Sequence, residues 1–301
     1  MIDRACLSLN YRCNIRCLYC YFANRKKTAT ADDFEFSPDE AVQIIDNITN
    51  YARARDLHKF KLGLVGSGEP LLSFQALAAI VEQAKTAAGL FSLYTITNGL
   101  TLTGEQIDFF YENRSVIELN FSLDGYRELH DHLRQGFDQT MAAILQYEKV
   151  FGEKPRLNAT VTRKSWAQKE DLVGFFLENK FNRINFSIVV ETSDPDLSLS
   201  RAEYDDFLDY GEARGLIMRQ KQAAKGKKYD CTMFGRLCGL GRNNIFFTRA
   251  GVYPCGRFID RPDYRLADFN SPLEEIEKGF TRLKHIKDGS CYYETVLGKE
   301  T

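Results

Sequence analysis

The chain has 301 residues, is 44% hydrophobic and 27% charged, and carries a formal net charge of −1. This is the composition of a soluble globular protein with one large domain or two modest ones, and without a long run of one charge sign we expect neither nucleic acid nor a membrane as partner. No apolar stretch approaches about 20 residues and the N-terminus lacks a signal-peptide core, so we expect a cytoplasmic protein. Eight cysteines then favour metal sites over disulfides.

Apolar, β-rich runs alternate with helical patterns over the first two thirds of the chain. The expected strands are Cys6–Leu9, Phe60–Val65, Phe91–Thr97, Ile117–Leu123, Arg156–Thr162 and Arg183–Val190. Several are apolar nearly throughout, as in strands that are covered on both faces. Regular strand–helix alternation predicts a parallel sheet, and parallel barrels place their chemistry on the loops at the carboxyl ends of the strands.

Helix starts can be read from capping boxes, in which a Ser or Thr precedes a Glu or Gln by three residues. Such boxes are expected at Ser37, Thr103, Ser165 and Ser200, and a later capped helix is expected to start at Ser271. After about residue 220 the pattern changes, and residues 221–228 are predicted to be a linker or exposed turn. The following Cys- and Gly-rich region contains two short expected strands, Asn244–Thr248 and Val252–Cys255. We therefore divide the chain into residues 1–220 and 221–301.

Cys13, Cys17 and Cys20 form the motif C-x3-C-x2-C directly after the first expected strand. Three thiolates from one loop can hold three irons of a [4Fe–4S] cluster, whereas a protein that only passes electrons normally supplies four. The remaining iron is then open to another ligand. A C-x2-C pair alone is often a zinc or thiol redox site, but the third cysteine and the lack of a nearby His favour a cluster.

Three short motifs end the next expected strands. They are Ser67-Gly68-Glu69-Pro70, Thr97-Asn98-Gly99 and Ser122-Leu123-Asp124-Gly125, and a His130-to-Arg134 segment follows the last of them. Each has an ordinary structural interpretation as well, because Gly, Pro and Asn-Gly pairs mark turns in many proteins. His130 and His132 are two residues apart, which suits structural or solvated histidines better than a helical metal pair.

Together these motifs resemble those of the radical SAM enzymes, and the resemblance covers about residues 4–292. It implies an α/β fold, a partial (β/α)6 TIM-type barrel with a small C-terminal cysteine-rich domain of the SPASM or twitch type. It further implies that S-adenosylmethionine (SAM) binds the open iron and is cleaved reductively to a 5′-deoxyadenosyl radical. The cofactor carries this chemistry, and the protein positions it and excludes water.

The resemblance also implies a set of SAM-binding residues. They are Tyr19, Gly68, Glu69, Asn98, Ser122 and Arg134. In the family pattern Glu69 binds the methionine amino group, and Ser122 and Arg134 bind the carboxylate, a charge-assisted pairing natural to Arg. Tyr19 contacts adenine or is a core aromatic, Asn98 contacts SAM or belongs to a turn, and Asp124 caps or braces its loop.

A second set of cysteines lies near the C-terminus, comprising Cys231, Cys238, Cys255 and Cys291. The segment from Cys238 to Phe258 resembles the hairpin that opens a SPASM domain, and four Cys can ligate one auxiliary [4Fe–4S] cluster. A structural zinc site is the alternative. No cysteine lies between Cys255 and Cys291, so a second auxiliary cluster is not expected. Cys6 is expected to be a small buried hydrophobe.

The resemblance favours a radical SAM oxidoreductase that modifies a peptide or protein, by crosslinking, oxidation or epimerisation. The alternatives are a twitch-type small-molecule dehydrogenase and anaerobic sulfatase maturation, which Gly256 disfavours because sulfatase-maturating enzymes have an acidic residue there. The cluster loop already begins at residue 13, so we expect no leader-recognition domain before it. A peptide substrate would then need a separate leader-recognition protein or direct capture in the barrel mouth. A flavodoxin or ferredoxin would supply electrons. No catalytic acid or base is assigned. Five side chains either face a pocket or belong to the packing or the surface, namely Trp166, Tyr253, Arg257, Tyr292 and Tyr293.

Overall fold

The computed structural model describes residues 1–24, 35–87, 89–189, 192, 194–218, 221, 229–230, 237–259, 261–283 and 291–297. Its strands are β1 (Arg4–Leu7), β2 (Phe60–Leu64), β3 (Phe91–Thr97), β4 (Ile117–Ser122), β5 (Leu157–Val161), β6 (Arg183–Ile188), β7 (Ile217–Met218), β8 (Tyr229–Asp230), β9 (Leu237–Cys238), β10 (Asn244–Thr248) and β11 (Gly251–Tyr253). Its helices are α1 (Tyr21–Asn24), α2 (Pro38–Ala54), α3 (Phe74–Lys85), α4 (Gly104–Glu112), α5 (Arg127–Leu133), α6 (Phe137–Phe151), α7 (Arg163–Ala167), α8 (Lys169–Glu178), α9 (Arg201–Ala213), α11 (Leu273–Gly279) and α12 (Tyr292–Leu297). Short 3-10 turns are η2 (Pro70–Ser73), η3 (Gly256–Phe258), η4 (Pro262–Tyr264) and η5 (Phe280–Arg282).

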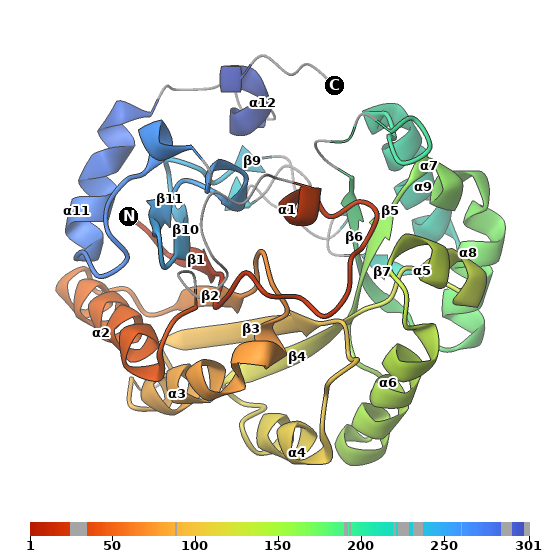
Figure 1. The fold of residues 1–301 in the computed structure, drawn as a ribbon, viewed down its shortest axis with the longest axis horizontal. Helices are drawn as coiled ribbons and strands as arrows, with labels where there is room; N and C mark the ends of the chain where they lie inside the picture. Colours follow the sequence, from red (N-terminus) through yellow and green to blue (C-terminus); the bar gives the residue numbers. More distant parts are fainter. Residues whose placement is uncertain are drawn as a thin grey trace.

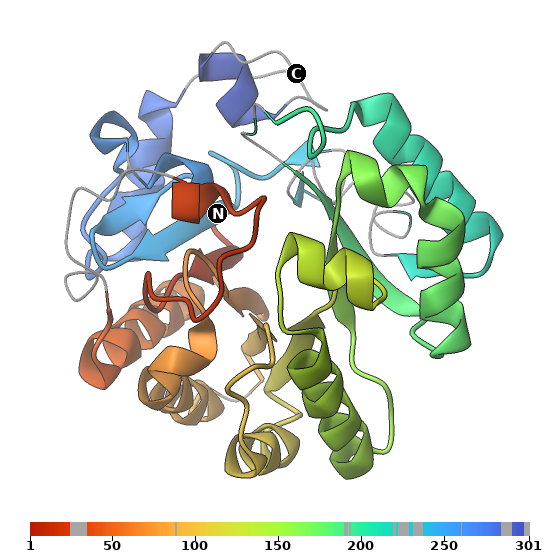
Figure 2. The same ribbon diagram turned by 45° about the vertical axis from the view of Figure 1, so that its right-hand side comes forward.

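A nine-stranded sheet forms the centre, in the order β11-β10-β1-β2-β3-β4-β5-β6-β7. Strands β1 to β7 pair in parallel, β10 is parallel to β1, and β11 is antiparallel to β10. Helices α2, α3, α4, α6 and α8 follow one another along the outer side of the curved sheet, as Figure 1 and the turned view in Figure 2 show. The predicted α/β fold with a partial TIM-type barrel is confirmed.

Alternation along the strands separates the two faces of this sheet. In β6, Phe186 packs against Phe176 of α8 and Phe207 of α9, with ring centroids 6.0 and 4.8 Å apart. Its neighbours Asn185 and Ser187 therefore point to the opposite, inner face. In β6 the aromatic side chain thus packs on the outer face, and the polar side chains lie on the inner face.

The C-terminal hairpin extends the barrel sheet. Arg4 of β1 lies opposite Asn244 of β10, so the cysteine-rich region is hydrogen-bonded to the first barrel strand. On the outside, Arg55, which caps the C-terminus of α2, pairs with Glu274 and Glu277 of α11 at 3.0 Å each. The division at residue 220 stays a prediction, and the expected linker, apart from Lys221, lies outside the described residues.

Three of the expected capping boxes are confirmed, at Ser37, Thr103 and Ser200. The box expected at Ser165 is wrong, because β5 ends at Val161 and Thr162 already caps α7, accepting a hydrogen bond from the Ser165 N–H at 3.2 Å. The side-chain cap expected at the start of α11 is also wrong. That helix begins one residue after Pro272, which has no side-chain oxygen to offer. Among the described helices, none combines the length and apolar character of a membrane span.

Candidate functional site

The loop of residues 10–20 leaves the carboxyl end of β1 and carries the three cysteines of the first motif. It is anchored by the Leu18 N–H, which donates to the carbonyl of Leu133 at the end of α5 (2.9 Å). The pKa of Cys17 is raised to about 11, mainly by burial, and the neighbouring Cys20 and Cys13 act in the same direction. The three thiols therefore lie within electrostatic reach of one another, as ligands of one cluster must.

The motif after β2 is joined to this cysteine loop by short contacts. The Glu69 N–H donates to the carbonyl of Arg12 at 2.7 Å, and Asn10 Nδ2 donates to the carbonyl of Glu69 at 3.1 Å. A Cβ on Gly68 would lie 2.0 Å from Asn10 Oδ1 and 2.5 Å from the Arg12 carbonyl oxygen. Only glycine fits at this position, so Gly68 fixes the distance between the two loops.

We expect Gly68→Ala to lower the free energy of unfolding by roughly 1–3 kcal/mol, because the added methyl overpacks against backbone. It should also lower the iron bound after anaerobic reconstitution. The matched control is Gly174→Ala in α8, where a Cβ meets nothing within 4 Å. That variant should gain about 0.5–1 kcal/mol in urea unfolding, since Ala suits a helix better than Gly. Equal effects of the two substitutions would contradict this role of Gly68.

Glu69 is 3% exposed, and its carboxylate is held by three donors. Thr97 Oγ1 donates to Oε1 at 2.7 Å, the Asn98 N–H donates to Oε2 at 2.9 Å, and the Leu71 N–H donates to Oε1 at 3.3 Å. A carboxylate has about four acceptor positions, so one is left for a further donor. Burial raises the pKa of Glu69, while these hydrogen bonds and Arg134 act to lower it.

Arg134 and Asp124 form a polar group with Tyr19 of the cysteine loop, in which Asp124 is buried and the other two are part-buried. Arg134 Nη1 donates to the Tyr19 hydroxyl at 2.8 Å and lies 3.5 Å from Asp124 Oδ1, and the Tyr19 hydroxyl donates to Asp124 Oδ2 at 2.5 Å. Asp124 is fully buried. Burial acts to lower the pKa of Arg134, but Tyr19 and Asp124 raise it more, so the guanidinium stays charged. Its Nε is buried without a hydrogen-bond partner.

The remaining residues implied to bind SAM lie at the same edge of the sheet. Asn98 directly follows β3, and its Nδ2 donates to Oδ1 of Asn14 in the cysteine loop at 2.7 Å. Ser122 ends β4 and lies opposite Asn158 of β5. Their contacts with SAM stay predictions, as does the adenine contact of Tyr19. Asp124 does brace its loop, because its Oδ1 accepts from the Thr160 N–H at 2.8 Å.

Sequence reasoning missed two residues of this site. Thr97 holds the Glu69 carboxylate, and Asn10 holds both the Glu69 carbonyl and the Ser73 hydroxyl, the latter at 2.7 Å. The signal for Thr97 was present, since it directly precedes Asn98 at the end of a strand. His130 is buried, and its Nδ1 accepts from the Asp124 N–H at 3.2 Å, which makes it structural.

Three cysteines of the second set also lie close together. Cys238 ends β9, Cys255 follows β11, and Cys291 precedes α12, all against a small apolar cluster. That cluster comprises Leu240, Tyr253, Phe258, Tyr292 and Tyr293. Burial raises the pKa of Cys255 to about 12, and Cys291 and Cys238 contribute in the same direction. The fourth predicted ligand, Cys231, lies outside the described residues.

The donor sets at both places suit iron–sulfur clusters. Across the part of the chain that the structure describes, no three His, Cys, Asp or Glu side chains converge on a single metal ion. A [4Fe–4S] cluster takes one thiolate per iron, so its ligands surround the cluster instead of meeting at one point. Of the described thiols at these two places, Cys13 is exposed and the others are part-buried. Coordination to iron would deprotonate each of them.

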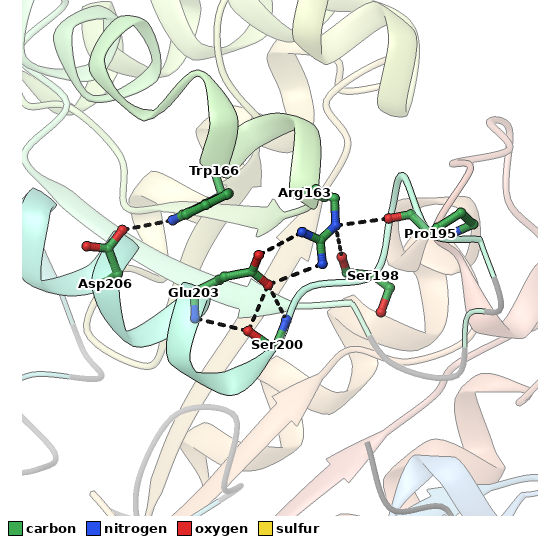
Figure 3. Close-up of polar contacts among 7 residues, drawn as sticks. All are labelled: Arg163, Trp166, Pro195, Ser198, Ser200, Glu203 and Asp206. Atoms are coloured by element: carbon green, nitrogen blue, oxygen red, sulfur yellow. Dashed lines mark hydrogen bonds and ion pairs between the residues drawn. The ribbon is translucent and has the colours of Figure 1, made fainter.

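Of the aromatic residues that could have faced a pocket, Trp166 packs on the outside. Its Nε1 donates to Asp206 of α9 at 2.8 Å, next to an ion pair between Arg163 and Glu203 (Figure 3). Arg163 also donates to the carbonyls of Pro195 and Ser198, at 3.1 Å each. This group holds the segment after β6 against α7 and α9, so its role is structural.

Comparison with known proteins identifies a family and several relatives. Residues 7–154 match the Radical SAM superfamily. GTP 3′,8-cyclase of Limosilactobacillus fermentum is 27% identical over 190 residues, covering 62% of this chain and 53% of the cyclase. The serine-type anaerobic sulfatase-maturating enzyme of Bacteroides thetaiotaomicron is 27% identical over 188 residues, covering 60% and 44%. The chain thus spans about half the length of these two relatives.

A solved structure extends the likeness beyond the matched segment. The structure of native anSMEcpe with bound AdoMet and the Cp18Cys peptide has a TM-score of 0.71 and 18% identity, covering 94% of this chain and 83% of that one. At this identity the likeness shows the fold alone. Fold, cysteine loop and matched segment together place this chain in the radical SAM superfamily of enzymes.

Proposed function

We propose that this chain cleaves SAM reductively at a [4Fe–4S] cluster held by Cys13, Cys17 and Cys20 and removes hydrogen from a peptide or protein. The observation that carries the proposal is that two groups of opposite charge lie beside the cysteine loop, the buried carboxylate of Glu69 and the part-buried guanidinium of Arg134. Glu69 has an acceptor position left, and Arg134 has a buried Nε without a partner. When bound, the cluster and SAM supply the 5′-deoxyadenosyl radical.

These two side chains complement the amino-acid end of SAM. The ammonium group of methionine is a donor that fits Glu69, and the carboxylate is an acceptor that fits the guanidinium of Arg134. Both protein groups are held in place before SAM arrives, Glu69 by Thr97 and Arg134 by Asp124. Such preorganisation lowers the entropy lost on binding.

A peptide substrate is supported by the relatives, since one is a sulfatase-maturating enzyme and a protein of the same fold binds a peptide. Sulfatase maturation itself is less well supported. The position after Cys255 is Gly256, and a Cβ there would lie 2.8 Å from the ring of Phe246. No acidic side chain fits without displacing that ring. A small-molecule substrate is the second candidate, because a GTP cyclase matches 62% of the chain.

The auxiliary cluster belongs to the same proposal, with Cys238, Cys255 and Cys291 as ligands and Cys231 as the fourth. We expect Cys255→Ala to leave SAM cleavage measurable and to stop product formation. The measurement follows 5′-deoxyadenosine and the mass of a candidate peptide in one anaerobic reaction. Full product formation by this variant would show that the auxiliary cluster is not needed. Zinc bound at this site in place of iron would show that it is structural.

A mass spectrum of the peptide distinguishes the possible modifications. Loss of one hydrogen pair indicates a crosslink or desaturation, whereas unchanged mass with deuterium uptake in heavy water indicates epimerisation. A peptide unchanged in both solvents, while 5′-deoxyadenosine still forms, favours the small-molecule substrate.

A further inference from the structure

Arg257 lies beside the second group of cysteines, and the SAM-binding proposal does not use it. The side chain belongs to η3 and is 8% exposed. Its Nη1 lies 3.4 Å from Cys291 Sγ and 3.0 Å from Glu294 Oε1, and its guanidinium lies over the Tyr293 ring at 3.9 Å from the centroid. A cation fixed next to a thiol exerts an electrostatic effect on a metal centre that the sulfur binds.

A second contact links the same residue to another thiol. The backbone N–H of Arg257 acts to lower the pKa of the Cys255 thiol, two residues earlier in the chain. One residue therefore contacts Cys291 through its side chain and lies next to the Cys255 thiol through its backbone. Glu294 is carried by α12, in the first turn after Cys291, so its charge is held near the same sulfurs.

We propose that Arg257 and Glu294 act in opposite directions on the reduction potential of the auxiliary cluster. The inference rests on the proposed function, since it requires that cluster. Reduction adds one electron and thus one negative charge. Hydrogen bonds to the sulfurs and a nearby positive charge stabilise the reduced form, and these are known determinants of cluster potentials. Arg257 therefore raises the potential, and Glu294 lowers it by offsetting the guanidinium charge.

The test uses Arg257→Gln and Glu294→Gln in the full chain, each in a background with Cys13, Cys17 and Cys20 replaced by alanine. In that background the auxiliary cluster alone contributes to the signal. Redox titration followed by electron paramagnetic resonance gives the potential without any turnover. We expect Arg257→Gln to disfavour reduction roughly tenfold and Glu294→Gln to favour it by a similar factor, each about 59 mV for one electron.

Two controls separate this role from packing and from overall charge. Arg257→Lys keeps the cation and should shift the potential less than Arg257→Gln, and replacing the exposed Arg261 by Gln should leave it unchanged. Shifts of the same sign in Arg257→Gln and Glu294→Gln, or no shift in either, would overturn the inference. If Arg257→Gln fails to retain iron, the upward shift of the reduction potential expected for Glu294→Gln still tests the inference. A background protein without iron would overturn the auxiliary cluster itself, and this inference with it.

Discussion

Replacing Cys13, Cys17 or Cys20 by alanine should abolish SAM cleavage. Each substitution removes one of three thiolates from a cluster that already lacks a fourth protein ligand, so the remaining pair cannot hold it. We expect 5′-deoxyadenosine to fall below detection, and the iron and sulfide bound after reconstitution to fall to the amount of the auxiliary cluster. Chemical iron analysis and chromatography of the reaction products measure the two effects.

Cys6→Ala is the matched control for these variants. Cys6 lies in β1, a few residues before the cluster loop, and its Sγ is 3.9 Å from the Tyr94 hydroxyl. The loss of Cys6 should leave the rate of SAM cleavage within about threefold of the wild-type rate. This is smaller than a tenfold change, which corresponds to about 1.4 kcal/mol. Cleavage that survives in Cys17→Ala, or is lost in Cys6→Ala, would contradict the assigned ligands.

Arg134→Gln should weaken both the fold and SAM binding. The substitution leaves the fully buried Asp124 without its cation, which costs about 3–5 kcal/mol of unfolding free energy. It also removes the charged donor proposed for the SAM carboxylate, worth about 1.5–3 kcal/mol. We therefore expect the SAM dissociation constant to rise by roughly tenfold to a hundredfold. Urea unfolding and equilibrium dialysis with labelled SAM measure the two losses.

The double variant Arg134→Gln with Asp124→Asn separates these effects. With the carboxylate neutralised, the buried charge is gone and part of the lost stability should return. SAM binding should stay weak, because the donor is still missing. Wild-type SAM affinity in the double variant would show that Arg134 only neutralises Asp124, and the proposed carboxylate contact would be wrong.

Local sequence patterns predicted most of the framework. The strands Phe91–Thr97 and Asn244–Thr248 were predicted to the residue, because their apolar runs end at clear turn signals. The prediction of the first strand at Cys6–Leu9 is wrong by two residues at each end, because β1 covers Arg4–Leu7. The reason is tertiary: Arg4 pairs with Asn244 on one side and Lys61 on the other, and this pairing overrides its polar character.

The contacts of the site depended on pairings that no local pattern reveals. Tyr19 and Asp124 are 105 residues apart in the chain, and Thr97 and Glu69 are 28 apart. Motifs at strand ends predicted which residues gather at one edge of the sheet. They did not predict that Arg134 would be shared between a tyrosine and an aspartate, nor that Arg257 would contact Cys291. Those contacts arise from packing between distant elements.

The central claim is that this chain cleaves SAM reductively, and formation of 5′-deoxyadenosine tests it most directly. The measurement uses the anaerobically reconstituted full chain with SAM and a chemical reductant, and needs no knowledge of the substrate. We expect 5′-deoxyadenosine and methionine to form in equal amounts, and the Cys17→Ala variant to form neither. A protein with its cluster spectrum intact that forms no 5′-deoxyadenosine from bound SAM would contradict the account.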